Sequence, residues 1–258
     1  MQDVSTGKTG LTPRLVRAEL IVVFAVSLGA SALRSLISLI GSLTAPAELK
    51  AQHAVLVGTR APGRPWLDLS LQLADIAIAL APVALVAYLL VRSGESARTI
   101  GADLREPGRD LLRGALLAAV VGGTGLAFYL LALRSGINLD VVPDRLPDVW
   151  WRVPILLLAA AQNGVLEEVI VSGYLLHRLD ALGWRPWRAV GLSATLRGSY
   201  HLYQGFGGFV GNVAMGLLFG RLYQRWGRAM PLVVAHTLID AVAFVGYGLL
   251  RGRVSWLP

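Results

Sequence analysis

Runs of roughly 20 apolar residues alternate along the chain with shorter segments that are rich in arginine, aspartate and proline. A helix of about 20 apolar residues is long enough to cross the hydrocarbon core of a bilayer. Within that core a helix satisfies its backbone hydrogen bonds internally, whereas irregular chain does not. The pattern therefore predicts an all-α fold, a polytopic transmembrane helical bundle.

The apolar runs predict about seven spans. They cover approximately residues 18–43, 70–92, 114–133, 150–179, 187–204, 207–224 and 230–250. The mixed-charge stretch between the second and third runs, residues 93–113, is expected to form an interfacial helix. We divide the chain into a disordered cytoplasmic N-terminus (1–17), N-terminal transmembrane helices (18–149) and a C-terminal transmembrane core (150–258).

Composition and charge agree with a membrane protein. Charged residues make up 16% of the chain, whereas soluble domains carry about 25%. The net charge of +8 could suggest nucleic acid, but the basic residues flank the apolar runs and do not line one helical face. We therefore expect the lipid bilayer, and no nucleic acid, as a partner. The absence of cysteine excludes disulfides, thiol nucleophiles and cysteine-ligated metals.

Lysine and arginine are unevenly distributed between the two ends of the expected spans. The connecting segments on the membrane face that holds the N-terminus contain 14 of these residues. The segments on the opposite face contain 8. Because cytoplasmic loops are enriched in Lys and Arg, this bias favours a multi-pass protein of the cell membrane with a cytoplasmic N-terminus.

Ionisable and amide side chains interrupt the apolar helices of the C-terminal core. Such residues are costly in a bilayer and usually mark functional sites. Two pairs are four residues apart and therefore share a helix face. The candidates are Glu167, Glu168, Arg197, His201, Asn212, His236 and Asp240.

These residue types suit the activation of water. Glu167 could act as a general base while His201 helps to hold a water molecule. His236 could stabilise an oxyanion, with Asp240 accepting its ring N–H and fixing its tautomer. The expected chemistry is peptide-bond hydrolysis without a covalent intermediate and without a cofactor. Glu167, His201 and His236 would alternatively form a zinc-ligand set, although the chain lacks an H-E-x-x-H helix.

Three short motifs in residues 150–250 resemble those of the CPBP family, the CAAX-processing and bacteriocin-processing membrane proteases that are also called the Abi family. The family patterns are EExxxR, FxxxH and HxxxN or HxxxD. The corresponding segments are EEVIVS from Glu167, RGSYH ending at His201, and HTLID from His236 to Asp240. The resemblance implies an intramembrane endopeptidase in which Glu167 and His201 activate water, His236 and Asp240 stabilise the oxyanion, and Glu168 is a supporting residue. It also implies a cavity that opens towards the cytosol and the bilayer, and a peptide or membrane-protein substrate.

The sequence departs from the family pattern at two positions. Ser172 stands where the first motif has arginine, and Arg197 stands where the second has phenylalanine. We hypothesise that Arg197 supplies from the fifth expected span the charge that is missing at Ser172; a structural ion pair is the alternative. Asn212 could support the site, although a hydrogen bond between helices is the more common use of such a residue.

Two other classes of function stay open at this level. One is a catalytically inactive membrane scaffold or immunity-type relative of the family, which would tolerate loss of Glu167. The other is a proton-coupled transporter that uses the buried Glu and His residues as a relay. The chain lacks the symmetric pair of broken helices expected of a transporter built from repeats.

Overall fold

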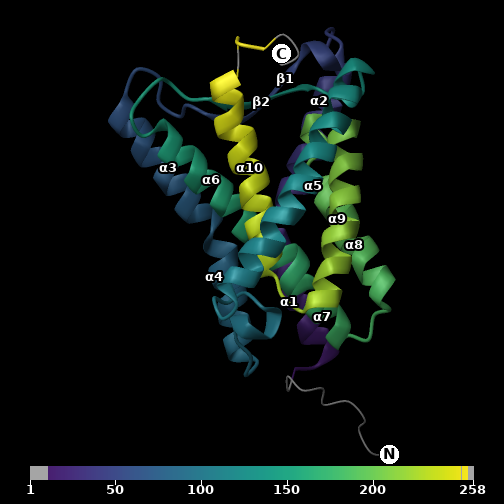
Figure 1. Cartoon of the computed structure of the whole chain (residues 1–258). Coiled ribbons are helices and arrows are strands. Elements are labelled where there is room, and N and C mark those ends of the chain that lie inside the picture. Colours follow the sequence, from purple (N-terminus) through teal and green to yellow (C-terminus); the bar gives the residue numbers. More distant parts are fainter. Residues whose placement is uncertain (1–10, 251, 255–258) are drawn as a thin grey trace, which may run out of the picture.

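The computed structural model describes residues 11–250 and 252–254, and Figure 1 shows an upright bundle of helices. The α-helices are α1 (Pro13–Ala25), α2 (Leu28–Thr44), α3 (Pro65–Ala79), α4 (Ala81–Arg92), α5 (Pro107–Arg134), α6 (Arg152–Glu167), α7 (Leu175–Ala181), α8 (Pro186–Ser199), α9 (Phe206–Trp226) and α10 (Met230–Leu250). Three short 3₁₀ segments are η1 (Leu49–Ala51), η2 (Ala97–Ile100) and η4 (Leu202–Gln204), and a π-helical segment is η3 (Glu168–Tyr174). The all-α fold class is confirmed.

Fewer helices than expected are long and apolar enough to cross a membrane. Four qualify among the described residues, and a fifth is added if the bent pair α1–α2 counts as one span. The expected number of seven is not confirmed, because α8 and α9 do not meet the criterion. With 14 residues α8 is only about 21 Å long, short of the roughly 30 Å hydrocarbon core.

Several boundaries also differ from those expected. Helix α1 begins at Pro13, so the last residues of the segment expected to be disordered are helical, while residues 1–10 lie outside the described chain. No interfacial helix covers 93–113; η2 lies there, and α5 already begins at Pro107. The first span is bent by 47° between α1 and α2, and the second breaks at Leu80, two residues before a proline that sits in the first turn of α4.

A small sheet at one end of the bundle was not predicted. Strand β1 (His53–Gly58) lies between α2 and α3, and β2 (Asp140–Arg145) lies between α5 and α6. The two strands are parallel, with His53 opposite Asp140. Figure 1 places them at the end of the bundle opposite the start of α1.

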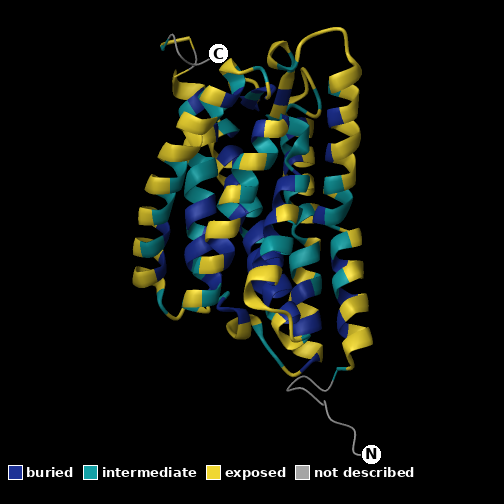
Figure 2. Cartoon of the chain, turned by 90° about the vertical axis from the view of Figure 1, so that its right-hand side faces the viewer, coloured by how far each residue is buried: buried dark blue, intermediate teal, exposed yellow. Residues whose placement is uncertain are grey.

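The helix formed by α6, η3 and α7 is the centre of the bundle. Within the best apolar window of Arg152–Ala181, 56% of residues are buried, against 6% for Pro107–Arg134. In Figure 2 the exposed positions lie mainly on outward faces of the helices, as expected where lipid covers them. Gly164 allows α10 to approach closely, because a Cβ there would lie 2.5 Å from Thr237 Oγ1. This contact sets α6 and α10 side by side.

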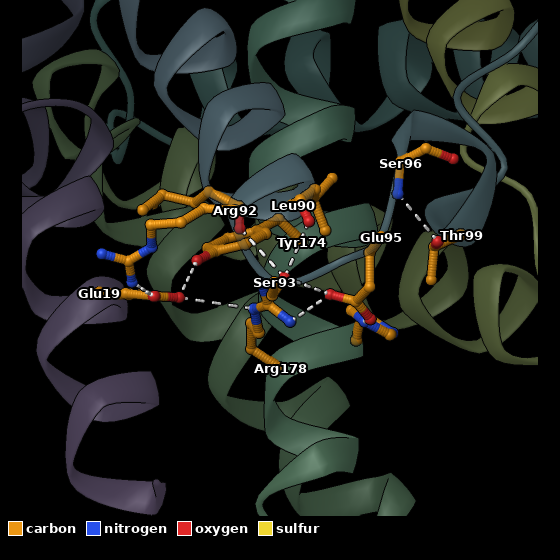
Figure 3. A network of polar contacts seen from close by, with 11 residues as sticks. Glu19, Leu90, Arg92, Ser93, Glu95, Ser96, Thr99, Tyr174 and Arg178 are labelled. Atoms are coloured by element: carbon orange, nitrogen blue, oxygen red, sulfur yellow. Dashed lines mark hydrogen bonds and ion pairs between the residues drawn. The ribbon is translucent and has the colours of Figure 1, made fainter. Parts of the chain in front are cut away.

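A polar network ties the other end of the bundle together (Figure 3). Arg178 of α7 is fully buried and donates to Glu95 Oε2 at 2.5 Å, and its Nε lies 3.8 Å from Glu19 of α1. Glu19 also accepts from Tyr174 at 3.0 Å and pairs with Arg92 of α4. The network joins α1, α4 and α7, so it fixes the lower half of the central helix against its neighbours.

Candidate active site

The three motif segments meet in the middle of the bundle. Glu167 ends α6, and Glu168 begins η3. Arg197 lies in the last turn of α8, and His201 follows two residues after the end of that helix. His236 projects from the first half of α10. The side chains of Glu167, Glu168, Arg197 and His236 are all buried. Four of the charged candidates therefore gather at one point, as the resemblance implies.

Arg197 bridges the two adjacent glutamates. Its Nη2 lies 2.5 Å from Glu168 Oε1, and its Nη1 lies 3.4 Å from Glu167 Oε2. Ser172, at the departure from the first motif, donates its hydroxyl to Glu168 Oε2 at 2.6 Å. The side chain that neutralises the glutamates thus comes from α8, one turn before His201. Ser172 is small, so it leaves room for this guanidinium, and its hydroxyl adds a hydrogen bond to Glu168.

Glu168 and Glu167 have different surroundings although they are neighbours. Both oxygens of Glu168 are bound, since Oε1 also accepts from His236 Nδ1 at 2.8 Å, and the residue is fully buried. Glu167 Oε2 accepts from the Tyr200 hydroxyl at 2.8 Å, and Glu167 lines a cavity. Within the described chain, Glu167 Oε1 has no hydrogen-bond or ion-pair partner. This oxygen can accept a hydrogen bond from a ligand or water.

The cavity has a volume of about 930 Å³ and runs from the motif residues towards β1. Its inner wall includes Glu167, Tyr200, His201, His236 and Asp240. Its other end is lined by half-exposed charged side chains, which include the ion pair Arg60–Asp75 at 2.8 Å. The cavity therefore reaches the sheet end of the bundle, away from the start of α1.

The expected pairing of His236 with Asp240 is wrong. The distance from His236 Nε2 to Asp240 Oδ1 is 3.8 Å, too long for a hydrogen bond. Glu168 binds Nδ1 of this ring instead, and Asp240 accepts from Asn163 Nδ2 at 3.0 Å. Both residues do share one helix face and line the cavity, but a different carboxylate orients the imidazole.

His201 is oriented by the last turn of α8, the helix that precedes it. Its Nδ1 lies 3.0 Å from the carbonyl oxygen of Arg197, and a carbonyl can only accept. Nδ1 must therefore carry the proton, which leaves Nε2 as an acceptor. Asn212 donates to the carbonyl of Gly208 in its own helix and does not line the cavity, so it supports neither the site nor a neighbouring helix.

Tyr200 and Arg34 also line the cavity, although neither belongs to the fixed positions of the three motifs. Tyr200 is buried and donates to Glu167, and its backbone carbonyl accepts from Ser35 of α2 at 2.8 Å. Its place one residue before a motif histidine was a signal, but aromatic residues are common in helix packing. Arg34 lines the cavity from α2 and makes no ion pair within the described chain.

One group of side chains could hold a metal ion. Ligand atoms of Glu167, Glu168 and His236 lie within 4.8 Å of one another. This group contains Glu168 in place of His201, which was expected in the alternative ligand set. Arg197 already pairs with both carboxylates, so a cation would have to compete with a buried guanidinium. The residues fit an ion pair better than a metal site.

The C-terminal part of the chain matches a known protein family. Residues 149–242 match a family model described as type II CAAX prenyl endopeptidase Rce1-like. The match contains all three motif segments and leaves out α1 to α5. No curated protein and no solved structure matches the chain. Residues 149–242 are therefore similar to the Rce1-like family, and this match supports the resemblance of the C-terminal part of the chain to the CPBP family.

Proposed function

We propose that the chain is an intramembrane endopeptidase in which Glu167 activates water for attack on a peptide bond. The observation that carries the proposal is the contrast between the two adjacent glutamates. Glu168 is enclosed by Arg197, Ser172 and His236, whereas Glu167 keeps one oxygen free on the wall of the cavity. Glu168 therefore organises the site, and Glu167 is the carboxylate that can reach a substrate.

The proposed reaction begins with a water molecule between Glu167 and His201. Glu167 Oε1 takes one proton from this water, while Nε2 of His201 accepts a hydrogen bond from the second O–H, which stays on the attacking oxygen. The oxygen attacks the carbonyl carbon and a tetrahedral oxyanion forms. Collapse of the oxyanion breaks the C–N bond, and Glu167 returns its proton to the leaving amine. Two new termini result, and the enzyme is unchanged.

Two neighbours assist this reaction in the proposal. His236 holds its Nδ1 against Glu168, so in the protonated ring the Nε2–H is available to donate to the oxyanion. The Tyr200 hydroxyl fixes the carboxylate of Glu167 through Oε2, which leaves Oε1 aimed at the cavity. The substrate is a peptide or a membrane-protein segment, and the catalytic step needs no cofactor.

The test is cleavage of a quenched fluorescent peptide library by the purified protein in detergent. We expect the wild type to cleave and Glu167→Gln to be inactive, with no effect of a metal chelator on the wild type. Equal cleavage by both proteins would contradict the proposed base. Loss of activity on chelation, restored by zinc, would instead assign Glu167, Glu168 and His236 as ligands.

A control variant separates loss of chemistry from loss of folding. Glu106 forms an exposed i,i+3 ion pair with Arg109, far along the chain from the motifs. Glu106→Gln makes the same chemical change as Glu167→Gln and should keep wild-type activity. Equal thermal unfolding of the two variants would show that the loss in Glu167→Gln is catalytic.

A further inference from the structure

Strand β1 forms part of the wall of the catalytic cavity. Three consecutive residues, Leu56, Val57 and Gly58, line it, although neighbouring side chains in a strand point to opposite faces. No residue of β2 lines the cavity within the described chain. The cavity therefore runs along the edge of β1 that is not paired with β2.

The hydrogen-bond pattern identifies which peptide groups lie on this edge. Asp140 donates its N–H to the carbonyl of Gln52 at 2.9 Å. In a parallel pair, alternate residues of a strand face the partner. With this register, Ala54 and Leu56 face β2, and the N–H and C=O groups of Val55 and Val57 face the opposite edge.

The outer edge of β2 is blocked, whereas that of β1 is open. On β2, the N–H of Leu139 donates to Gln204 and that of Val141 donates to the Tyr129 hydroxyl. The next outward position is Pro143, which has no N–H. In the described part of the chain, Val57 makes no backbone hydrogen bond beyond the β1–β2 ladder. Unpaired strand edges readily accept another strand.

Charge in the same cavity favours a peptide that carries a negative group. Arg34 lines the cavity from α2 and has no acidic partner in the described residues, while Arg60 is already paired with Asp75. A bound carboxylate would neutralise Arg34. An extended peptide satisfies both features, because its backbone supplies donors and acceptors and its side chains supply the charge.

We propose that an extended, acidic peptide binds as a third strand on the open edge of β1, hydrogen-bonded to Val57, with Arg34 contacting its negative charge. The strand then leads along the cavity towards Glu167. This inference deepens the proposed function, since the bound strand is the substrate of that site.

The first test removes the donor on the open edge. Val57→Pro deletes an N–H that the β1–β2 ladder does not use, and proline is tolerated at such edge positions. The matched control is Val55→Pro, which makes the same change on the same edge at a residue that does not line the cavity. For a peptide found in the library assay, we expect Val57→Pro to raise KM by about 5- to 10-fold with kcat nearly unchanged. Val55→Pro should change neither.

Equal KM for wild type and Val57→Pro would overturn the proposal, as would equal effects of the two prolines. A second measurement covers the case in which Val57→Pro unfolds. The same peptide is N-methylated at one position at a time, and its binding to the Glu167→Gln protein, which keeps Val57, is measured by fluorescence anisotropy. Loss of binding at every second position supports a bound strand, and loss without such alternation contradicts it.

The binding measurement also separates this inference from the proposed function. It is made on the Glu167→Gln protein, so it needs no cleavage, and the probes are fluorescein-labelled acidic library peptides. If binding alternates with the N-methylated position but the wild type cleaves nothing, the proposed strand site is supported and the proposed peptidase activity is contradicted. If the wild type cleaves peptides but binding does not alternate with the N-methylated position, the peptidase activity is supported and the strand site is contradicted.

Discussion

Arg197 Nη2 lies 2.5 Å from Glu168 Oε1, so the buried charge of the first motif is balanced from α8. This contact supports the hypothesis that the positive charge has moved between helices. The arginine of the family pattern would lie one turn after Glu168, where this chain has Ser172. The two departures from the pattern thus compensate each other in space.

Removal of this arginine should be severe. Arg197→Ala leaves two buried carboxylates without their cation, and breaking a buried pair costs about 3–5 kcal/mol. We expect a loss of stability of that order in chemical denaturation in detergent, and a kcat/KM at least 100-fold lower, or about 3 kcal/mol. Arg197→Lys keeps the charge but loses the fork that reaches both glutamates, so it should recover only part of the activity. Full activity of Arg197→Lys would show that the charge alone suffices.

The compensation can be reversed by restoring the family pattern. Ser172→Arg alone adds a second buried cation and should abolish folding or activity. Ser172→Arg combined with Arg197→Phe returns the charge to the central helix, and we expect the pair to be more active than Ser172→Arg alone. A double-mutant cycle on kcat/KM measures this coupling. Simple additivity of the two changes would show that the positions are independent.

Glu168 should matter more than Asp240 for the action of His236. Glu168 binds Nδ1 at 2.8 Å, whereas Asp240 lies 3.8 Å from Nε2. Loss of a carboxylate that fixes a catalytic imidazole can cost several orders of magnitude. We expect Glu168→Gln to lower kcat by about 100-fold or more, and Asp240→Asn by less than about 10-fold. The opposite order would place the orienting role at Asp240.

Acid should weaken the network around Arg178. Burial alone would raise the pKa of Glu95, but hydrogen bonds from Ser93 and His177 and the charges of His177 and Arg178 lower the pKa below its usual value near 4.5. The folded state then binds fewer protons than the unfolded state, so this stabilisation is complete above pH 4.5 and is lost as the pH falls through the lowered pKa.

The corresponding variant is Glu95→Gln, followed by thermal unfolding in detergent between pH 3 and 7. We expect a lower Tm than the wild type at pH 7, and a difference that shrinks towards pH 3. Glu106→Gln is the control, because its exposed pair with Arg109 is worth at most about 1 kcal/mol. A Tm difference for Glu95→Gln that does not change with pH would contradict the role of its charge.

Close packing of α6 on α10 should be sensitive to a single methyl group. A Cβ at Gly164 would lie 2.5 Å from Thr237 Oγ1 and 2.9 Å from the carbonyl of Val233, so Gly164→Ala forces the helices apart. We expect a lower Tm and at least a 10-fold loss of activity, since the two helices carry Glu167 and His236. At Gly123 of α5 nothing lies within 4 Å of the added atom, and Gly123→Ala should be neutral or stabilising. Similar effects of the two substitutions would contradict the close contact.

The sequence predicted the helical class and the motif residues because both depend on local pattern. The seventh expected span matches α10, at residues 230–250. The i,i+4 spacing placed His236 and Asp240 on one face, as observed. It could not decide which carboxylate binds His236, because Glu168 comes from another helix.

The sheet and the reduced number of spans could not be predicted in the same way. Strands β1 and β2 are short and pair across more than 80 residues of chain, and neither alone has a strong signal. Helices α8 and α9 are apolar enough to resemble spans, but α8 is too short to cross alone. Only the contacts between helices show that Tyr200 belongs to the site.

The start of α1 and the sheet end of the cavity lie at opposite ends of the bundle. The orientation of the protein in the membrane therefore decides from which side a substrate enters the cavity. If the excess of arginine marks the cytoplasmic face, peptides reach Glu167 from the exterior, and the enzyme acts on segments that have already been exported. If the cavity opens to the cytosol as in the family pattern, the N-terminus lies outside and the charge bias is inverted. A chain without cysteine is well suited to decide this, because a single thiol introduced beside Arg60 can be labelled by an impermeant reagent from one face only.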